Sequence, residues 1–201
     1  MDNVQRNAIA FSKLVEFEYF FVVAYKGKQK KICLKFAKED FHHLEGIGQL
    51  NDLTYHSMPA TKTFQMALEG EITEEKLKKS QKYFSKGVNN KVDYLYLLET
   101  FLDNNEIVFN FVKDMTGKTR IDAKMFLYTD MDGNDIYLFI DSADSDVYFG
   151  RSFVAKSSYN YRVGQRKLTV LWKEKIHKET KRREVLYRFK NFESELICEN
   201  G

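Results

Sequence analysis

Two short segments organise the chain: Phe149-Gly150-Arg151-Ser152-Phe153 and Tyr159-Asn160-Tyr161-Arg162-Val163-Gly164-Gln165. The first belongs to an apolar run, residues 147–154, whose pattern is typical of a β-strand. A polar turn follows, and residues 167–175 then form a basic strand. An arginine, a serine, a tyrosine and a glutamine thus lie within fifteen residues of one another. Together these side chains can hold and polarise a phosphodiester without a metal ion.

Alternating apolar residues indicate further strands on both sides of this stretch. Residues 17–36 form a predicted hairpin around Gly27. Asp132-Gly133 is a strong hairpin turn signal between two later strands. The remaining predicted strands cover residues 107–111, 125–128, 136–140 and 184–189.

Helical periodicity dominates the first half of the chain. Residues 3–14 and 38–50 carry apolar stripes, and a helical block follows over residues 60–103. Residues 91–102 give its strongest helix. We therefore expect one α+β domain over residues 1–201, with the N-terminal hairpin and the helices packed on a late antiparallel β-sheet.

The net charge of +3 hides two blocks of opposite sign. Residues 93–146 hold 4 Lys and Arg against 12 Asp and Glu, which gives −8. Residues 151–190 hold 13 against 3, which gives +10. A cationic block of this size favours a face that binds polyanions, although a solvated, salt-screened surface explains the same count.

Several classes of function lack their motifs. The sequence has no phosphate-binding P-loop, no dinucleotide-binding glycine pattern, no nucleophile elbow and no paired-cysteine metal site. We therefore expect no cofactor and no bound metal. Only two cysteines occur, and neither a signal peptide nor a membrane-spanning run is seen, so the expected location is the cytoplasm.

Acid–base and cationic side chains are the candidates that remain. One of His42 and His43 can exchange protons near neutral pH, because the two point about 100° apart on a helix. Arg151 can hold a phosphate with its guanidinium fork, and Ser152 can donate a hydrogen bond to it. The 118–120 segment forms a second cationic patch. For each of them an ordinary structural role is the alternative.

Three blocks of sequence resemble one family of nucleases. They are Phe41-His42-His43-Leu44-Glu45-Gly46-Ile47, Lys118-Thr119-Arg120-Ile121-Asp122-Ala123, and Arg151-Ser152-Phe153 with Tyr161, Gly164-Gln165 and Leu171-Trp172-Lys173-Glu174-Lys175. Their order is similar to that of the phage-type subgroup of the barnase–EndoU–colicin–RelE-like fold, over roughly residues 15–190. The resemblance implies helices followed by a four-stranded antiparallel sheet, and metal-independent RNA cleavage. Asn160 departs from the family, in which many members have an acidic residue before the tyrosine.

The resulting hypothesis is a toxin-like or phage-conflict endoribonuclease that leaves a cyclic phosphate. The expected catalytic residues are His43, Lys118, Arg151, Ser152 and Tyr161. The expected substrate-binding residues are Thr119, Gln165, Arg162, Arg166, Lys167 and Lys173. The partners would be RNA, such as tRNA, and an antidote protein. The alternatives are a non-catalytic nucleic-acid-binding module, an inhibitor that uses the acidic 93–146 segment, and a nucleotide-modifying transferase.

Overall fold

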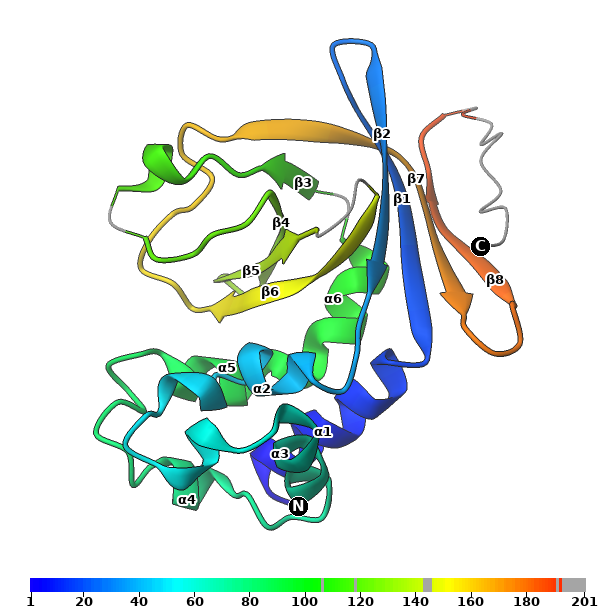
Figure 1. Cartoon of the computed structure of the whole chain (residues 1–201). Helices are drawn as coiled ribbons and strands as arrows, with labels where there is room; N and C mark the ends of the chain where they lie inside the picture. The colour runs from blue at the N-terminus through cyan, green and yellow to red at the C-terminus, as the bar shows by residue number, and fades with distance from the viewer. Residues whose placement is uncertain (106, 118, 143–145, 191, 193–201) are drawn as a thin grey trace.

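The computed structural model describes residues 1–105, 107–117, 119–142, 146–190 and 192 (Figure 1). Its α-helices are α1 (Asn3–Leu14), α2 (Asp40–Leu44), α3 (Ala60–Leu68), α4 (Glu74–Leu77), α5 (Val88–Tyr94) and α6 (Leu98–Asn104). Its strands are β1 (Phe17–Tyr25), β2 (Lys28–Lys35), β3 (Ile107–Asn110), β4 (Met125–Met131), β5 (Asn134–Asp141), β6 (Val147–Ala155), β7 (Arg166–His177) and β8 (Arg183–Arg188). Short 3₁₀ helices complete it: η1 (Ile47–Gln49), η2 (Thr54–Ser57), η3 (Leu95–Leu97) and η4 (Lys113–Thr116). The α+β class is confirmed.

Both predicted hairpins form, and their turns explain why. Lys26 and Gly27 connect β1 to β2 with φ angles of 48° and 78°. Asp132 and Gly133 connect β4 to β5 with φ angles of 53° and 77°. Two successive residues with positive φ match the twist of the strands they join, and Asp and Gly tolerate that conformation well.

The strands form one eight-stranded sheet in the order β1-β2-β6-β5-β4-β3-β7-β8. Because β1 also pairs with β7, the sheet closes into a barrel. The prediction that the N-terminal hairpin packs on a late antiparallel sheet is therefore wrong, since the hairpin joins the sheet and β2 pairs with β6 in parallel. The sheet also exceeds the four strands that the resemblance implies. A period-two pattern identifies strands but not their partners, which explains the error.

The helices lie together at one end of the sheet (Figure 1). An aromatic cluster ties them to it, with ring centroids 5.3–6.2 Å apart. Its members come from α1, α2, α3 and the residue after β2: Phe11, Phe41, Phe64 and Phe36. All four rings are buried, so this cluster fixes α2 against the sheet.

The predicted helix over residues 91–102 is interrupted. The Asn7 side chain from α1 donates to the carbonyl oxygen of Val92 at 2.8 Å and accepts from the amide of Tyr96 at 3.1 Å. A side chain inserted into the backbone hydrogen bonds of a helix bends or breaks it. The segment therefore divides into α5, η3 and α6, an outcome that apolar spacing does not reveal.

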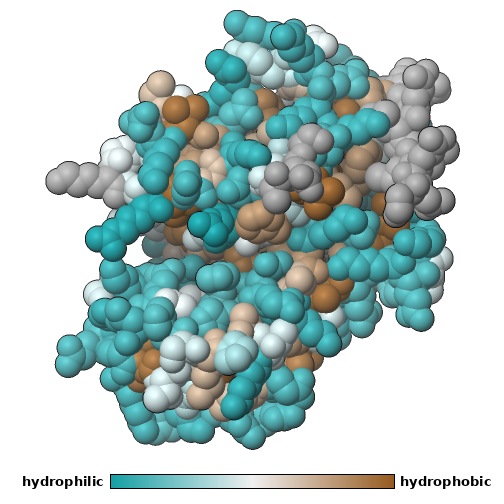
Figure 2. Space-filling view, in the orientation of Figure 1, coloured by the Kyte–Doolittle hydropathy of each residue, from teal (hydrophilic) through white to brown (hydrophobic). Residues whose placement is uncertain are grey.

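The surface is hollowed between the sheet half and the helical half (Figure 2). Many of the side chains on both sides of this hollow are hydrophilic (Figure 2). Among the described residues, no helix is both long enough and apolar enough to cross a membrane.

Candidate active site

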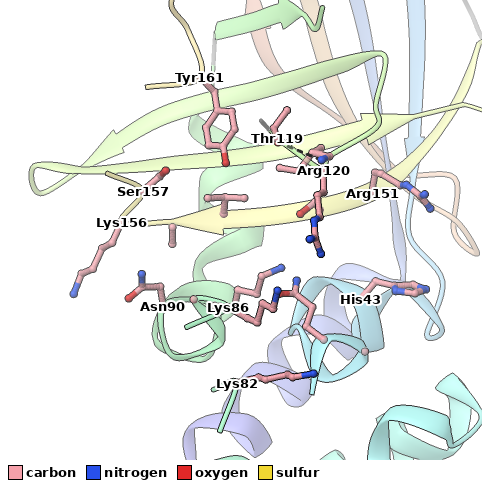
Figure 3. A pocket seen from close by; sticks show the side chains of 18 of the residues that line it. His43, Lys82, Lys86, Asn90, Thr119, Arg120, Arg151, Lys156, Ser157 and Tyr161 are labelled. Atoms are coloured by element: carbon pink, nitrogen blue, oxygen red, sulfur yellow. Dashed lines mark hydrogen bonds between the residues drawn. The ribbon is translucent and has the colours of Figure 1, made fainter. Parts of the chain in front are cut away.

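An open cleft of about 920 Å³ lies between the sheet and the helical layer. One wall consists of β6 with the loops at residues 119–122 and 156–161. The other wall comes from α2, from the 48–56 segment and from residues 82–91. Side chains enter from both walls, with Arg120 on the sheet side (Figure 3). Of the predicted site residues, the cleft is lined by His43, Thr119, Arg151, Ser152 and Tyr161.

Gly150 sets the distance between α2 and β6. A Cβ atom at this position would lie 3.1 Å from both Leu44 Cδ1 and Phe36 Cε1, so a glycine is needed for this close approach. Leu44 directly follows His43, and Gly150 directly precedes Arg151. The contact therefore brings His43 and Arg151 to the same end of the cleft (Figure 3).

Arg151 is the extra residue of a β-bulge. Phe139 on β5 pairs with Ser152 and Ile140 pairs with Gly150, so Arg151 has no partner in this register. A bulge re-aims a side chain, and bulges are frequent next to active sites. The Arg151 side chain is exposed, and none of the described residues forms a hydrogen bond or an ion pair with it. Its guanidinium is therefore available to a phosphate.

The two adjacent histidines have different surroundings, as the helical spacing predicts. His42 is 5% exposed, and its Nδ1 lies 3.0 Å from Thr63 Oγ1. Burial lowers the pKa of His42, and the imidazoles of His43 and His56 lower it further. The His43 ring is exposed and lines the cleft. Of the two, His43 is therefore the one placed to exchange protons with a ligand.

His56 is a second cleft imidazole that the sequence analysis missed. Its Nδ1 lies 2.7 Å from the carbonyl oxygen of Gly48. Because a carbonyl can only accept, Nδ1 carries the proton and Nε2 of the neutral ring is left as an acceptor. A Cβ atom on Gly48 would lie 3.6 Å from His43 Nδ1, so the loop that fixes His56 also packs near His43. His56 lies in a polar segment without periodicity, and no sequence signal marked it.

Tyr161 joins an aromatic cluster to the cleft. Its ring lies 5.1 Å from those of Tyr137 and Phe139. The pKa of Tyr161 is raised overall, because burial raises it more than hydrogen bonds with the Thr119 and Ser157 side chains lower it. The phenol is therefore protonated at neutral pH and can donate a hydrogen bond.

Five residues predicted to bind substrate do not line the cleft: Gln165, Arg162, Arg166, Lys167 and Lys173. The Arg162 guanidinium lies 4.1 Å from the centre of the Tyr128 ring, and the Arg166 guanidinium 4.4 Å from that of Tyr25. Lys167 is exposed on β7. These cations lie on the sheet surface, where stacking on aromatic rings holds the arginines in place.

Two of the five have partners within the protein. The Gln165 side chain accepts from the Val112 amide at 2.7 Å and donates to its carbonyl oxygen at 2.9 Å. Lys173 is 1% exposed and donates at 2.7–2.9 Å to carbonyl oxygens at the end of α6, those of Leu102, Asp103 and Asn105. These contacts join the 112 loop to β7 and α6 to the sheet. Lys118 lies outside the described residues.

The helical block over residues 60–103, for which the sequence indicated no particular role, contributes residues to the cleft. Lys82 and Lys86 both line the cleft. They are four residues apart, which places them on one side of a helical turn, and this spacing could have indicated a cationic surface from the sequence. Among the described residues of the lining, the cationic ones are Lys82, Lys86, Lys91, Arg120, Arg151 and Lys156, and the acidic one is Asp122. The cleft is thus strongly positive. In the described part of the chain, no three side chains of His, Cys, Asp or Glu gather as a metal site.

Comparison with protein families supports the resemblance seen in the motifs. The family described as phage-Barnase-EndoU-ColicinE5/D-RelE like nuclease4 matches residues 3–190, which include every residue that lines the cleft. The comparisons with curated proteins and with solved structures gave no match.

Proposed function

The chain belongs to this family of phage nucleases, and on that premise we propose that it is an endoribonuclease that cuts RNA without a metal ion. One observation carries the proposal. Packing of Leu44 on Gly150 holds an exposed imidazole, His43, and the Arg151 guanidinium, which has no partner among the described residues, at one end of a cationic cleft. An acid–base group beside a phosphate-binding cation is what cleavage of a phosphodiester requires.

In the proposed reaction, the 2′-oxygen of one nucleotide attacks the adjacent phosphorus, and the bond from phosphorus to the 5′-oxygen breaks. The products are a 2′,3′-cyclic phosphate and a free 5′-hydroxyl. A base takes the proton of the 2′-hydroxyl, and an acid returns a proton to the 5′-oxygen. His43 and His56 supply these two groups, each of which contributes about 10²- to 10⁴-fold in rate. The nucleophile belongs to the substrate, so no metal-bound water is needed.

The charge that develops on the phosphate is stabilised by Arg151. Loss of one such group from a preorganised site costs about 3 kcal/mol of transition-state stabilisation. Ser152, Thr119 and Tyr161 donate hydrogen bonds to the phosphate oxygens. Lys118, next to Thr119 in the chain, is the second cation of the proposal.

The cationic lining favours a polynucleotide over a small substrate. Each phosphate neutralised by a lysine or arginine releases counterions, so affinity falls steeply as salt rises. We propose a structured RNA such as tRNA as the target, in a cytoplasmic, toxin-like or phage-conflict role in which an antidote protein controls the activity.

The test is incubation of the purified protein with total tRNA in the presence of a chelator, followed by mapping of 5′-hydroxyl ends. We expect cleavage that His43→Ala slows by at least about 10²-fold. A target with a single 2′-deoxynucleotide at the cleaved position should resist. Cleavage of that target at the normal rate, or of RNA by His43→Ala at the parental rate, would refute the mechanism.

A further inference from the structure

Lys91 is a buried cation in the helical wall of the cleft. It lies on α5 and is 4% exposed, yet it is among the residues that line the cleft. Its Nζ atom is fully buried and has no hydrogen-bond partner among the described residues. Buried ammonium groups are normally paired, so this one needs an explanation.

The protein makes room for this lysine. Gly46 has a φ of 89°, and a Cβ atom there would lie 2.8 Å from Lys91 Cδ and 3.1 Å from Val88 Cγ2. A side chain at position 46 would therefore displace the stem of Lys91, and the positive φ disfavours one in any case. The fold thus holds the lysine stem in a slot beside the cleft.

Glu45, the residue that directly follows α2, interacts electrostatically with the Lys91 ammonium. Glu45 is fully buried, and both of its oxygens already accept from the Asn7 amide at 3.0 Å. Burial lowers the pKa of Lys91 to about 8 despite the opposing effect of Glu45. Burial also raises the pKa of Glu45 to about 8, so this carboxyl group is mostly protonated at neutral pH and does not compensate for the lost hydration of the ammonium, which keeps unused donors.

We propose that Lys91 forms a phosphate-binding subsite in the helical wall, which takes a phosphate of the substrate other than the one at His43 and Arg151. The ammonium has three donors for the oxygens of a phosphate, and rotation about the Cδ–Cε bond can turn it toward the cleft while the rest of the stem stays in its slot. Lys86 and Asn90 line the same wall of the cleft. The inference rests on the proposed function for the identity of the phosphate as part of a polynucleotide.

The direct test is lysine ¹³C NMR of the intact protein with inorganic phosphate as the probe. Without phosphate, the Cε signal of Lys91, assigned with Lys91→Met, should titrate near pH 8. Phosphate should raise that pKa by about one unit, which corresponds to tenfold tighter binding to the charged form. The signal of Lys62, exposed on α3, is the control and should not move. A Lys91 titration that phosphate leaves unchanged overturns the proposal.

Stability and kinetics separate a binding role from a structural one. Because the buried Lys91 ammonium has no hydrogen-bond partner in the described part of the chain, its removal should leave the urea midpoint of Lys91→Met equal to or above that of the wild type. A lower midpoint would identify Lys91 as a structural counter-ion of Glu45 and reject the proposal. On RNA, the variant should raise KM about tenfold and keep kcat within about twofold. A lowered kcat at unchanged KM also rejects it.

The two proposals fail in different ways. If wild-type protein cuts no RNA but phosphate shifts the Lys91 titration, the endoribonuclease proposal is rejected and the subsite stands. If RNA is cut and phosphate leaves the Lys91 titration unchanged, the subsite proposal is rejected and the endoribonuclease proposal stands.

Discussion

Replacement of Gly150 by alanine tests the contact on which the site is built. The new Cβ would lie 3.1 Å from Leu44 Cδ1, 3.1 Å from Phe36 Cε1 and 3.3 Å from Leu44 Cδ2. Ordinary contact begins at 3.4 Å, so the Leu44 and Phe36 side chains must give way by about 0.3 Å, and we expect α2 to move away from β6 with Leu44. Overpacking of this kind costs about 1–3 kcal/mol, and alanine recovers about 0.5–1 kcal/mol by restricting the unfolded chain. We expect a net loss of about 1 kcal/mol.

The effect on activity should exceed the effect on stability. His43 is adjacent to Leu44, so it moves with α2 relative to Arg151. A displacement of about 1 Å can cost about 10²-fold in rate, and scaling this to 0.3 Å gives about a fourfold loss of kcat. The assays are urea unfolding at pH 7 and single-turnover cleavage of the mapped RNA target. Val147→Ala, on the same strand and exposed, is the control and should keep the parental rate.

A double-mutant cycle tests whether the effect of Gly150→Ala comes from its contact with Leu44. Leu44→Ala removes both Cδ atoms, so Gly150→Ala should cost at least about 0.5 kcal/mol less in that background. The two residues are then coupled through the contact itself. Additive free energies, together with an unchanged cleavage rate in Gly150→Ala, would show that this contact does not position His43, and the reasoning would fail.

Three further predictions follow from individual side chains. Arg151→Ala should lower kcat/KM by about 10²-fold with no change in urea midpoint, because the guanidinium has no partner within the described residues; Arg151→Lys should restore only part of the rate, since an ammonium lacks the bidentate fork. Lys173→Met should cost about 3 kcal/mol or more in urea unfolding, because it leaves buried carbonyl oxygens at the end of α6 without their donor. Burial raises the pKa of Glu45 from its ordinary value of 4.5 to about 8. Between these two pH values the folded protein keeps the Glu45 proton and the unfolded chain releases it, so the free energy of unfolding should fall as pH rises from about 5 to 8. Glu45→Gln should abolish this pH dependence in unfolding experiments across that range.

The features that the sequence predicted well are local ones. The turns at Gly27 and Asp132-Gly133 depend on two residues each, and both hairpins form as expected. The helical spacing predicted that His42 and His43 point in different directions, and the burial of His42 agrees with it; the choice of His43 came from the resemblance to the nuclease family. Such features follow from neighbours in the chain, which a sequence displays directly.

The features it did not predict depend on partners far away in the chain. Asn7 breaks the helix over residues 91–102 through bonds that cross more than eighty residues. The bulge at Arg151 exists only relative to β5. His56 becomes a cleft residue because of its bond to the carbonyl of Gly48, in a segment without periodicity. No pattern within any of these three segments encodes such a pairing.

The distribution of charge shows most clearly what the sequence could not predict. Residues that form one charged block in the sequence do not form one charged surface in the folded protein. Of the +10 block over residues 151–190, Lys173 is used inside the fold, whereas Arg151 and Lys156 line the cleft. The −8 block over residues 93–146 contributes Arg120 to the same cleft, and the helical block contributes the rest. The positive field therefore arises from segments that only folding brings together. A peptide that covers the basic block alone carries its charge but lacks the cleft, so the site requires both the helical layer and the sheet.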